Sequence, residues 1–125
     1  MPEPIRPTQL HQVALFAHDL DRAIAFYRDV LGLPFLFQVP PGMAFFDCGG
    51  VRLLIGNAAA SGPNPPRSVL YYRVADIHAS AERLKAHGVL LPREPMMIAK
   101  VEDREVWLLQ FEDSEGNPVG LMQES

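Results

Sequence analysis

The strongest constraint in this sequence is an internal repeat. Residues 18–33 read HDLDRAIAFYRDVLGL, and residues 75–90 read ADIHASAERLKAHGVL. In each segment an aspartate comes before an apolar helical stripe, and a glycine follows the stripe. The aspartates are Asp19 and Asp76, and the glycines are Gly32 and Gly88. A repeat of this length indicates one supersecondary unit used twice, so it constrains the architecture more than any single motif does.

A strand-like run precedes each predicted helix. Residues 11–17 (HQVALFA) and 68–74 (SVLYYRV) are rich in apolar residues whose alternation is typical of strands. Each aspartate can then cap a helix, because its carboxylate accepts hydrogen bonds from unpaired backbone N–H groups. Apolar residues recur at helical spacing, namely Leu20, Ala23, Ile24, Tyr27, Val30 and Leu31 in the first helix and Ile77, Ala81 and Leu84 in the second. The glycine after each stripe predicts the helix end.

Further short strands are predicted after each helix. They are residues 35–39, 43–47 and 51–55 in the first half, and 89–91, 96–99, 105–111 and 118–123 in the second. Residues 57–67 (NAAASGPNPPR) are rich in Ala, Gly and Pro, and we interpret them as a linker. The sequence therefore predicts a single domain over residues 1–125, built from two strand–helix–three-strand modules at about 10–56 and 68–124.

Composition narrows the possible partners. The chain has 125 residues, is 48% hydrophobic and has a net charge of −4. It has no basic stripe, so we expect no nucleic-acid partner. It has no apolar run of the roughly 20 residues that a membrane span needs, and its first ten residues lack the apolar core of a signal peptide. With Cys48 as its single cysteine, the chain cannot form an internal disulfide, and we expect a cytoplasmic location.

The doubled module and two motifs resemble the vicinal oxygen chelate superfamily. The first motif is DLDRAIAFY at 19–27 followed by LGL at 31–33, and the second is DSEGNP at 113–118. This superfamily includes glyoxalase I, methylmalonyl-CoA epimerase, extradiol dioxygenases and the bleomycin- and fosfomycin-resistance proteins. The resemblance covers about residues 11–124. It implies the glyoxalase-like α+β fold, in which two tandem βαβββ modules form curved mixed sheets around a cavity, with the helices outside. It also implies a homodimer.

The resemblance further implies a metal site, which this sequence retains only in part. In the metal-dependent members, four inward His, Gln or Glu side chains bind one divalent ion that polarises a substrate oxygen. Two positions lie seven residues before the capping aspartates, and two lie four residues after the turn glycines Gly49 and Gly116. They are Gln12, Val69, Leu53 and Gly120. One amide oxygen among four positions cannot replace the hydration of an ion, so no metal cofactor is expected, and a divalent metal is the alternative.

Without a metal, the inward face would form a mostly apolar pocket. The predicted lining residues are Gln12, Ala14, Phe16, Leu53, Val69, Tyr71, Arg73, Trp107, Gly120 and Met122. Arg73 would bind an anionic ligand or pair with a glutamate. Tyr71 would donate to a ligand oxygen or fill space, and Trp107 would stack on a ligand or belong to the core. Gly120, in place of a glutamate, would leave a vacancy.

Three functions stay open on this reading. The first is binding or sequestration of a small organic ligand without metal, as in the drug-resistance branch. The second is a metal-dependent lyase or isomerase of the glyoxalase I or methylmalonyl-CoA epimerase type. The third is a metal-free enzyme that uses Tyr71, Arg73 or Glu105 for proton transfer. No catalytic residue can be assigned, and Cys48, which precedes a Gly-Gly turn and has no histidine beside it, is not expected to be a catalytic thiol.

Overall fold

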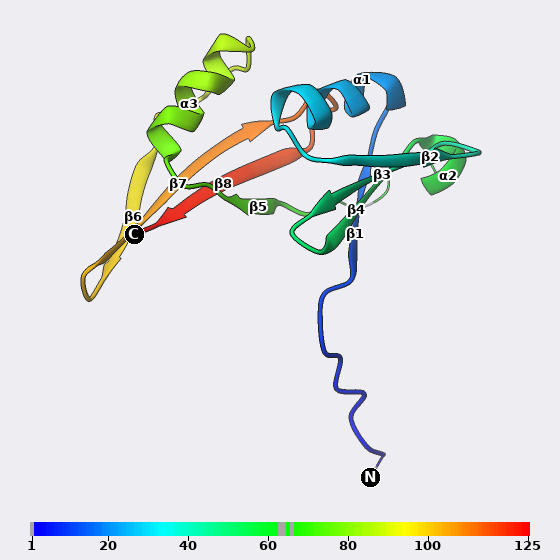
Figure 1. The fold of residues 1–125 in the computed structure, drawn as a ribbon, viewed down its shortest axis with the longest axis horizontal. Coiled ribbons are helices and arrows are strands. Elements are labelled where there is room, and N and C mark those ends of the chain that lie inside the picture. Colours follow the sequence, from blue (N-terminus) through cyan, green and yellow to red (C-terminus); the bar gives the residue numbers. More distant parts are fainter. Residues whose placement is uncertain (1, 63–64, 66) are drawn as a thin grey trace. The chain divides into compact units, whose positions relative to one another are not determined.

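The computed structural model describes residues 2–62, 65 and 67–125. The chain divides into two compact units, Met1–Pro65 and Pro66–Ser125, each with a four-stranded sheet (Figure 1). The division falls inside the predicted linker, of which residues 63, 64 and 66 lie outside the described part. The expected repeat is therefore visible as two separate βαβββ units.

The sheet of the first unit, sheet A, has the strand order β1-β4-β3-β2. Its strands are β1 (Gln12–Phe16), β2 (Phe35–Val39), β3 (Met43–Cys48) and β4 (Val51–Gly56). The strand before the helix, β1, pairs in parallel with the last strand, β4, and the other pairs are antiparallel. The parallel pair places the first and last strands of the module side by side.

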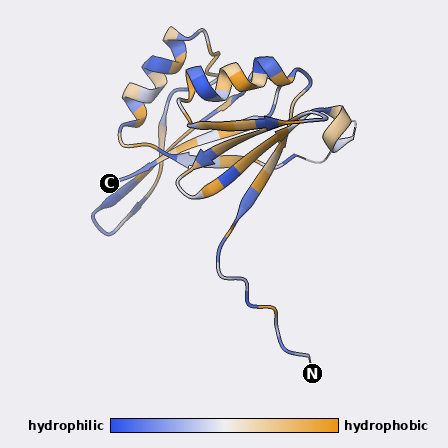
Figure 2. Ribbon diagram, turned by 45° about the vertical axis from the view of Figure 1, so that its right-hand side comes forward, coloured by the Kyte–Doolittle hydropathy of each residue, from blue (hydrophilic) through white to orange (hydrophobic). Residues whose placement is uncertain are grey.

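The first helix begins as predicted after Asp19, whose Oδ1 accepts a hydrogen bond of 3.1 Å from the Arg22 N–H. It runs as α1 (Leu20–Ala25) and continues as the π-helical turn η1 (Phe26–Val30). The wider turn buries Phe26 beside Tyr27, although the 3.6-residue stripe does not include Phe26. Figure 2 shows polar and apolar residues alternating along this helix, as expected for an element that packs on a sheet with one side.

The sheet of the second unit, sheet B, repeats this topology with the order β5-β8-β7-β6. Its strands are β5 (Leu70–Arg73), β6 (Met96–Val101), β7 (Arg104–Glu112) and β8 (Pro118–Glu124). Helix α3 (Ile77–Ala86) packs on β7 and β8 and buries the three predicted stripe residues. Its N-terminus is capped by Asp76 and by Gln123 of β8, whose Oε1 accepts from the Ile77 N–H at 2.7 Å. The predicted α+β fold of two βαβββ modules is confirmed.

One predicted strand is absent. Residues 89–91 form no strand, because the Val89 N–H donates to the Leu84 carbonyl at the end of α3 and is not available to a sheet. The linker contains a short helix, α2 (Ala58–Ser61), which Asn57 caps by accepting from the Ala59 N–H at 3.0 Å. Strand β6 runs two residues beyond its predicted end at residue 99, to Val101. No helix in the described part of the chain has the length and apolar character needed to cross a bilayer.

Candidate functional site

Each sheet has one face that packs against its helix and one face that does not. We call the second the open face: in sheet A it carries Gln12 and Ala14, and in sheet B it carries Tyr71 and Arg73. Side chains alternate along a strand, and residues paired across strands share a face, so the register assigns every strand residue to one face. These open faces carry most of the predicted lining residues and form the candidate site.

In sheet A, Gln12 and Ala14 are exposed, whereas Leu15 is buried in the core. Phe16 shares their face but is only 5% exposed. A Cβ added at its partner Gly56 would overlap Ser61 of α2, so α2 covers this end of the face. Only the small part of Phe16 that α2 does not cover can therefore line the site.

Leu53 does not lie on the open face, which corrects its predicted place in the pocket. It pairs with Val13, not with Gln12 or Ala14, and is 1% exposed in the core under α1. The residue equivalent to Gly120 is Leu54, because Leu54 pairs with Ala14 just as Gly120 pairs with Tyr71. The prediction counted four residues from Gly49, whereas the strand begins after Gly50.

Several open-face residues of sheet A were not predicted from the sequence, among them Phe45, Asp47 and Arg52. The two-residue turn between β3 and β4 sets Asp47 opposite Arg52 and Phe45 opposite Leu54. Phe45 packs against Phe37 with ring centroids 4.8 Å apart, and the Arg52 guanidinium lies 5.6 Å from the Phe45 ring centroid. The Gly49-Gly50 turn could have predicted these pairings, because a two-residue loop fixes the register of a hairpin.

In sheet B, the ring of Tyr71 lies over Gly120. A Cβ added at Gly120 would overlap Cδ1 and Cε1 of Tyr71, so the predicted vacancy at Gly120 is filled by that ring. The Tyr71 hydroxyl accepts a hydrogen bond of 2.9 Å from Nε2 of Gln110, which pairs with Gly120 from the other side. Tyr71 is 47% exposed, so its outer side remains accessible to a ligand.

Arg73 lies on the same face as Tyr71, two residues further along β5. Its Nη2 is 3.9 Å from Oε2 of Glu124, a distance beyond a hydrogen bond, and its side chain is 82% exposed. Such an exposed pair contributes little to stability. Arg73 therefore has a glutamate nearby and faces an open surface. Its role in binding an anionic ligand stays a prediction.

Trp107 lies on the helix-packed face of sheet B, which corrects its predicted place in the pocket. It pairs with Gln123 and Met97, and its ring contacts that of His78 in α3 at 4.8 Å. Its Nε1 donates to Oε1 of Glu105 at 2.9 Å. This hydrogen bond holds Glu105 with Trp107 on the helix-packed face, so Glu105 and Tyr71 lie on opposite sides of the sheet.

Two further predicted residues are Met122, on the open face of sheet B, and Val69, next to it. Met122 pairs with Arg73 and Leu108, which places an apolar stretch beside the guanidinium. Val69 precedes β5 and is 40% exposed. Met96 pairs with Leu108 and extends the apolar stretch to the outer strand β6.

The residues at the metal-ligand positions do not fit a divalent ion. With the register corrected, these positions hold Gln12, Leu54, Val69 and Gly120, so the correction adds no donor atom. At Gly120 the neighbouring volume is taken by the Tyr71 ring. Within residues 2–62, 65 and 67–125, no group of three His, Cys, Asp or Glu side chains is arranged to hold a metal. Divalent ions in proteins need several such donors.

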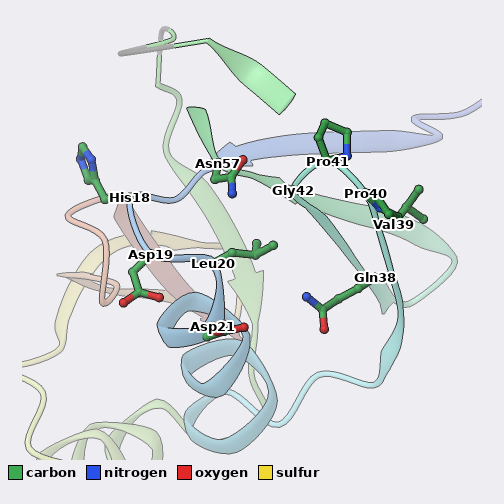
Figure 3. A pocket seen from close by; sticks show the side chains of 10 residues that line it. All are labelled: His18, Asp19, Leu20, Asp21, Gln38, Val39, Pro40, Pro41, Gly42 and Asn57. Atoms are coloured by element: carbon green, nitrogen blue, oxygen red, sulfur yellow. The ribbon is translucent and has the colours of Figure 1, made fainter. Parts of the chain in front are cut away.

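The first unit also has a shallow groove of about 690 Å³ between the start of α1 and the β2–β3 turn (Figure 3). Leu20 and Gln38 point toward this space, whereas His18 points away from it. Asp19 and Asn57, which also line the groove, are used as helix caps. The groove therefore shows no convergence of reactive groups, and none of its residues was predicted as a site residue.

The comparison with known families agrees with the topology. The sequence matches the profile of the Glyoxalase/Bleomycin resistance protein/Dioxygenase superfamily over residues 9–121, nearly the whole chain. The chain belongs to this superfamily. The resemblance drawn from the sequence is thereby confirmed, and no curated protein matches the chain.

Solved structures show the same fold. Lactoylglutathione lyase from Agrobacterium tumefaciens is 23% identical, with 94% of this chain and 95% of that chain covered and a TM-score of 0.78. A superfamily member from Sphaerobacter thermophilus is 20% identical, with 95% and 99% covered and a TM-score of 0.78. A glyoxalase/bleomycin resistance protein/dioxygenase from Nocardioides is 21% identical, with 96% and 85% covered and a TM-score of 0.71. At these identities the likeness concerns the fold, because one fold hosts many chemistries.

Proposed function

We propose that this superfamily member binds a small organic ligand against the open faces of its sheets, without a divalent metal at the usual position. The observation that carries this proposal is the Tyr71 ring over Gly120, where the metal-dependent members place a ligand side chain. An aromatic ring at that point offers a contact surface for an organic molecule and no donor for an ion. We also retain the cytoplasmic location as a prediction.

Exposed apolar side chains support a binding role for these faces. Phe37 on sheet A is 44% exposed, and Tyr71 and Met96 on sheet B are 47% and 44% exposed. Large apolar side chains that gather at an exposed surface mark binding or assembly sites more often than isolated ones do. We further propose that the chain forms a homodimer, because the outer strands β2 and β6 expose apolar residues as well.

Metal analysis tests the first part of the proposal. The untagged protein is incubated with Zn²⁺, Ni²⁺ or Mn²⁺, dialysed and assayed for bound metal. We expect far less than one equivalent of each ion, because one amide oxygen cannot hold a divalent cation. One equivalent of metal, removed by a chelator together with an enzymatic activity, would contradict the proposal and favour the metal-dependent lyase or isomerase.

Two methionines on opposite faces of sheet B offer a matched test of ligand binding. Small organic molecules are screened for those that raise the thermal unfolding midpoint, since a ligand that binds the folded state stabilises it. The stabilisation should be lost in Met122→Glu, on the open face, and kept in Met97→Glu, on the other face. Compounds that still raise the unfolding midpoint of Met122→Glu, or a screen that finds no stabilising compound, would contradict the open face as the binding site.

A further inference from the structure

The open face of sheet B presents one hydroxyl and one guanidinium on alternate residues of the same strand. Tyr71 and Arg73 pair with Gly120 and Met122 of β8, so both side chains project from the same face. Both are largely exposed, at 47% for the Tyr71 residue and 82% for the Arg73 side chain. The pair is therefore accessible from solvent.

The hydrogen bond to Tyr71 determines what its hydroxyl offers. Gln110 donates to the Tyr71 oxygen at 2.9 Å, so this oxygen acts as the acceptor in that contact. A phenol has one O–H donor in addition to its acceptor lone pairs. The donor of Tyr71 thus stays available for an acceptor outside the protein, and Gln110 acts as a positioning residue for it.

Arg73 supplies charge and several donors on the same face as Tyr71, two residues further along β5. A guanidinium carries five N–H donors in a planar fork that matches a carboxylate. Within the described residues its ion-pair partner is Glu124, at 3.9 Å from Nη2 to Oε2, which is too long for a hydrogen bond. The donors of Arg73 are therefore open to an anion, while the nearby Glu124 carboxylate disfavours a ligand with two negative charges.

Resting on the proposed function, we propose that the open face of sheet B is a receptor for small organic acids with an apolar body. The ligand carboxylate accepts hydrogen bonds from the Tyr71 hydroxyl and the Arg73 guanidinium. Its body lies on the apolar stretch formed by Met96, Leu108 and Met122. Glu124 restricts the ligand to a single negative charge, which selects a carboxylate over a phosphate monoester.

Benzoate, benzamide and phenyl phosphate share one ring and differ in the group that would meet Arg73. Binding of each probe to the full chain is followed by the methyl signals of ¹³C-labelled methionine, with Met122 on the open face and Met97 on the other face. We expect benzoate to shift Met122 but not Met97, and to bind at least about tenfold more tightly than benzamide, as the loss of a charged hydrogen-bonded pair implies. Phenyl phosphate should bind more weakly than benzoate.

Three variants assign the effect to residues. Arg73→Gln should remove the preference for benzoate over benzamide. Tyr71→Phe should weaken the binding of benzoate several-fold and that of benzamide less, because a hydrogen bond to a carboxylate is stronger than one to a neutral amide oxygen. Glu124→Gln should tighten the binding of phenyl phosphate more than that of benzoate or benzamide, because it removes the nearby negative charge. Arg83→Gln, an exposed change on α3, is the matched control and should leave all three affinities unchanged.

The outcomes separate this inference from the proposed function. Equal binding of benzoate and benzamide with a Met122 shift would overturn the carboxylate receptor and leave ligand binding at the open face intact. Tighter binding of phenyl phosphate than of benzoate, or an unchanged preference in Arg73→Gln, would also overturn the carboxylate receptor. If no probe shifts Met122 and the small-molecule screen gives no open-face ligand, both proposals fail.

Discussion

At the scale of single residues, the contact between Gly120 and Tyr71 explains why glycine occupies a strand position. Gly120→Ala would place a methyl group against the Tyr71 ring, which must then move away from Gln110. We expect a loss of about 1–3 kcal/mol in the free energy of unfolding, the usual range for an added methyl group in a packed site. Urea denaturation followed by circular dichroism measures it.

Tyr71→Ala provides the control for that substitution. With the ring removed, Gly120→Ala should cost less than about 0.5 kcal/mol, so the two changes should be strongly non-additive in a double-mutant cycle. An equal cost of Gly120→Ala with and without the ring would show that the backbone of β8, not the Tyr71 ring, requires glycine.

The surroundings of Cys48 lower the reactivity of its thiol. Partial burial and the neighbouring Asp47 carboxylate both raise the pKa of the Cys48 thiol above its ordinary value. A raised pKa means that less thiolate is present at pH 7–8, and the thiolate is the reactive form. We expect slow alkylation by iodoacetamide that accelerates as the pH rises. The same thiol in urea should react faster, and a folded chain that reacts as fast as the unfolded one would contradict this prediction.

At the scale of elements, the turn between β7 and β8 is held by a buried carboxylate. Oδ1 of Asp113 accepts from the backbone N–H groups of Glu115 and Asn117, both at 2.8 Å, and Oδ2 accepts from Nδ2 of Asn117 at 2.9 Å. Asp113 is 7% exposed, so its loss leaves buried donors without an acceptor. This turn also sets the start of β8, and therefore the register that places Gly120 against Tyr71.

Asp113→Ala should lower the free energy of unfolding by about 3 kcal/mol, because hydrogen bonds to a charged acceptor are worth roughly 1.5–3 kcal/mol each and water can re-enter only in part. Ser114→Ala, in the same turn, removes a hydroxyl that donates to Glu115 and should cost less than about 1 kcal/mol. Chemical denaturation of both variants tests the difference. Equal costs would assign the effect to loosening of the turn in general.

The elements could be predicted because their signals are local. Asp19 and Asp76 cap helices at the expected positions through hydrogen bonds within one turn of chain. The face of each strand was harder to predict, since alternation yields two sets of residues and does not say which set meets the helix. Trp107 was assigned to the wrong set for this reason. Its face follows from the pairing with Gln123, a residue 16 positions away.

The positions of the candidate site residues depend more on pairings between distant residues than the helices and strands themselves do. Counting from Asp19 assigns Gln12 to the face that it shares with Arg52 in the structure, because a short strand–helix connection fixes the count. Counting from the Gly49-Gly50 turn failed by one residue at Leu53, and a shift of one residue reverses the face. The contact of Tyr71 with Gly120 joins strands that are 49 residues apart, so no local pattern could indicate it.

At the scale of the whole molecule, both sheets leave apolar side chains on an outer strand. On β2, Phe35, Leu36 and Phe37 are 36–44% exposed, and on β6, Met96, Met97 and Ile98 are 44–49% exposed. Outer strands with apolar side chains invite pairing with another chain unless they are covered. Our proposed homodimer would cover such surfaces, and its stability should then depend on protein concentration.

We expect sedimentation equilibrium to yield twice the monomer mass at micromolar concentration. The thermal unfolding midpoint should rise as concentration increases, because association stabilises the folded state by mass action. Leu36→Glu and Ile98→Glu place a charge on each outer strand, and the variant at the interface should lower the mass and abolish the concentration dependence. His87→Glu, an exposed change at the end of α3, is the control. A monomeric mass with a midpoint that is independent of concentration would contradict the dimer, and these apolar strands would then face solvent or a different partner.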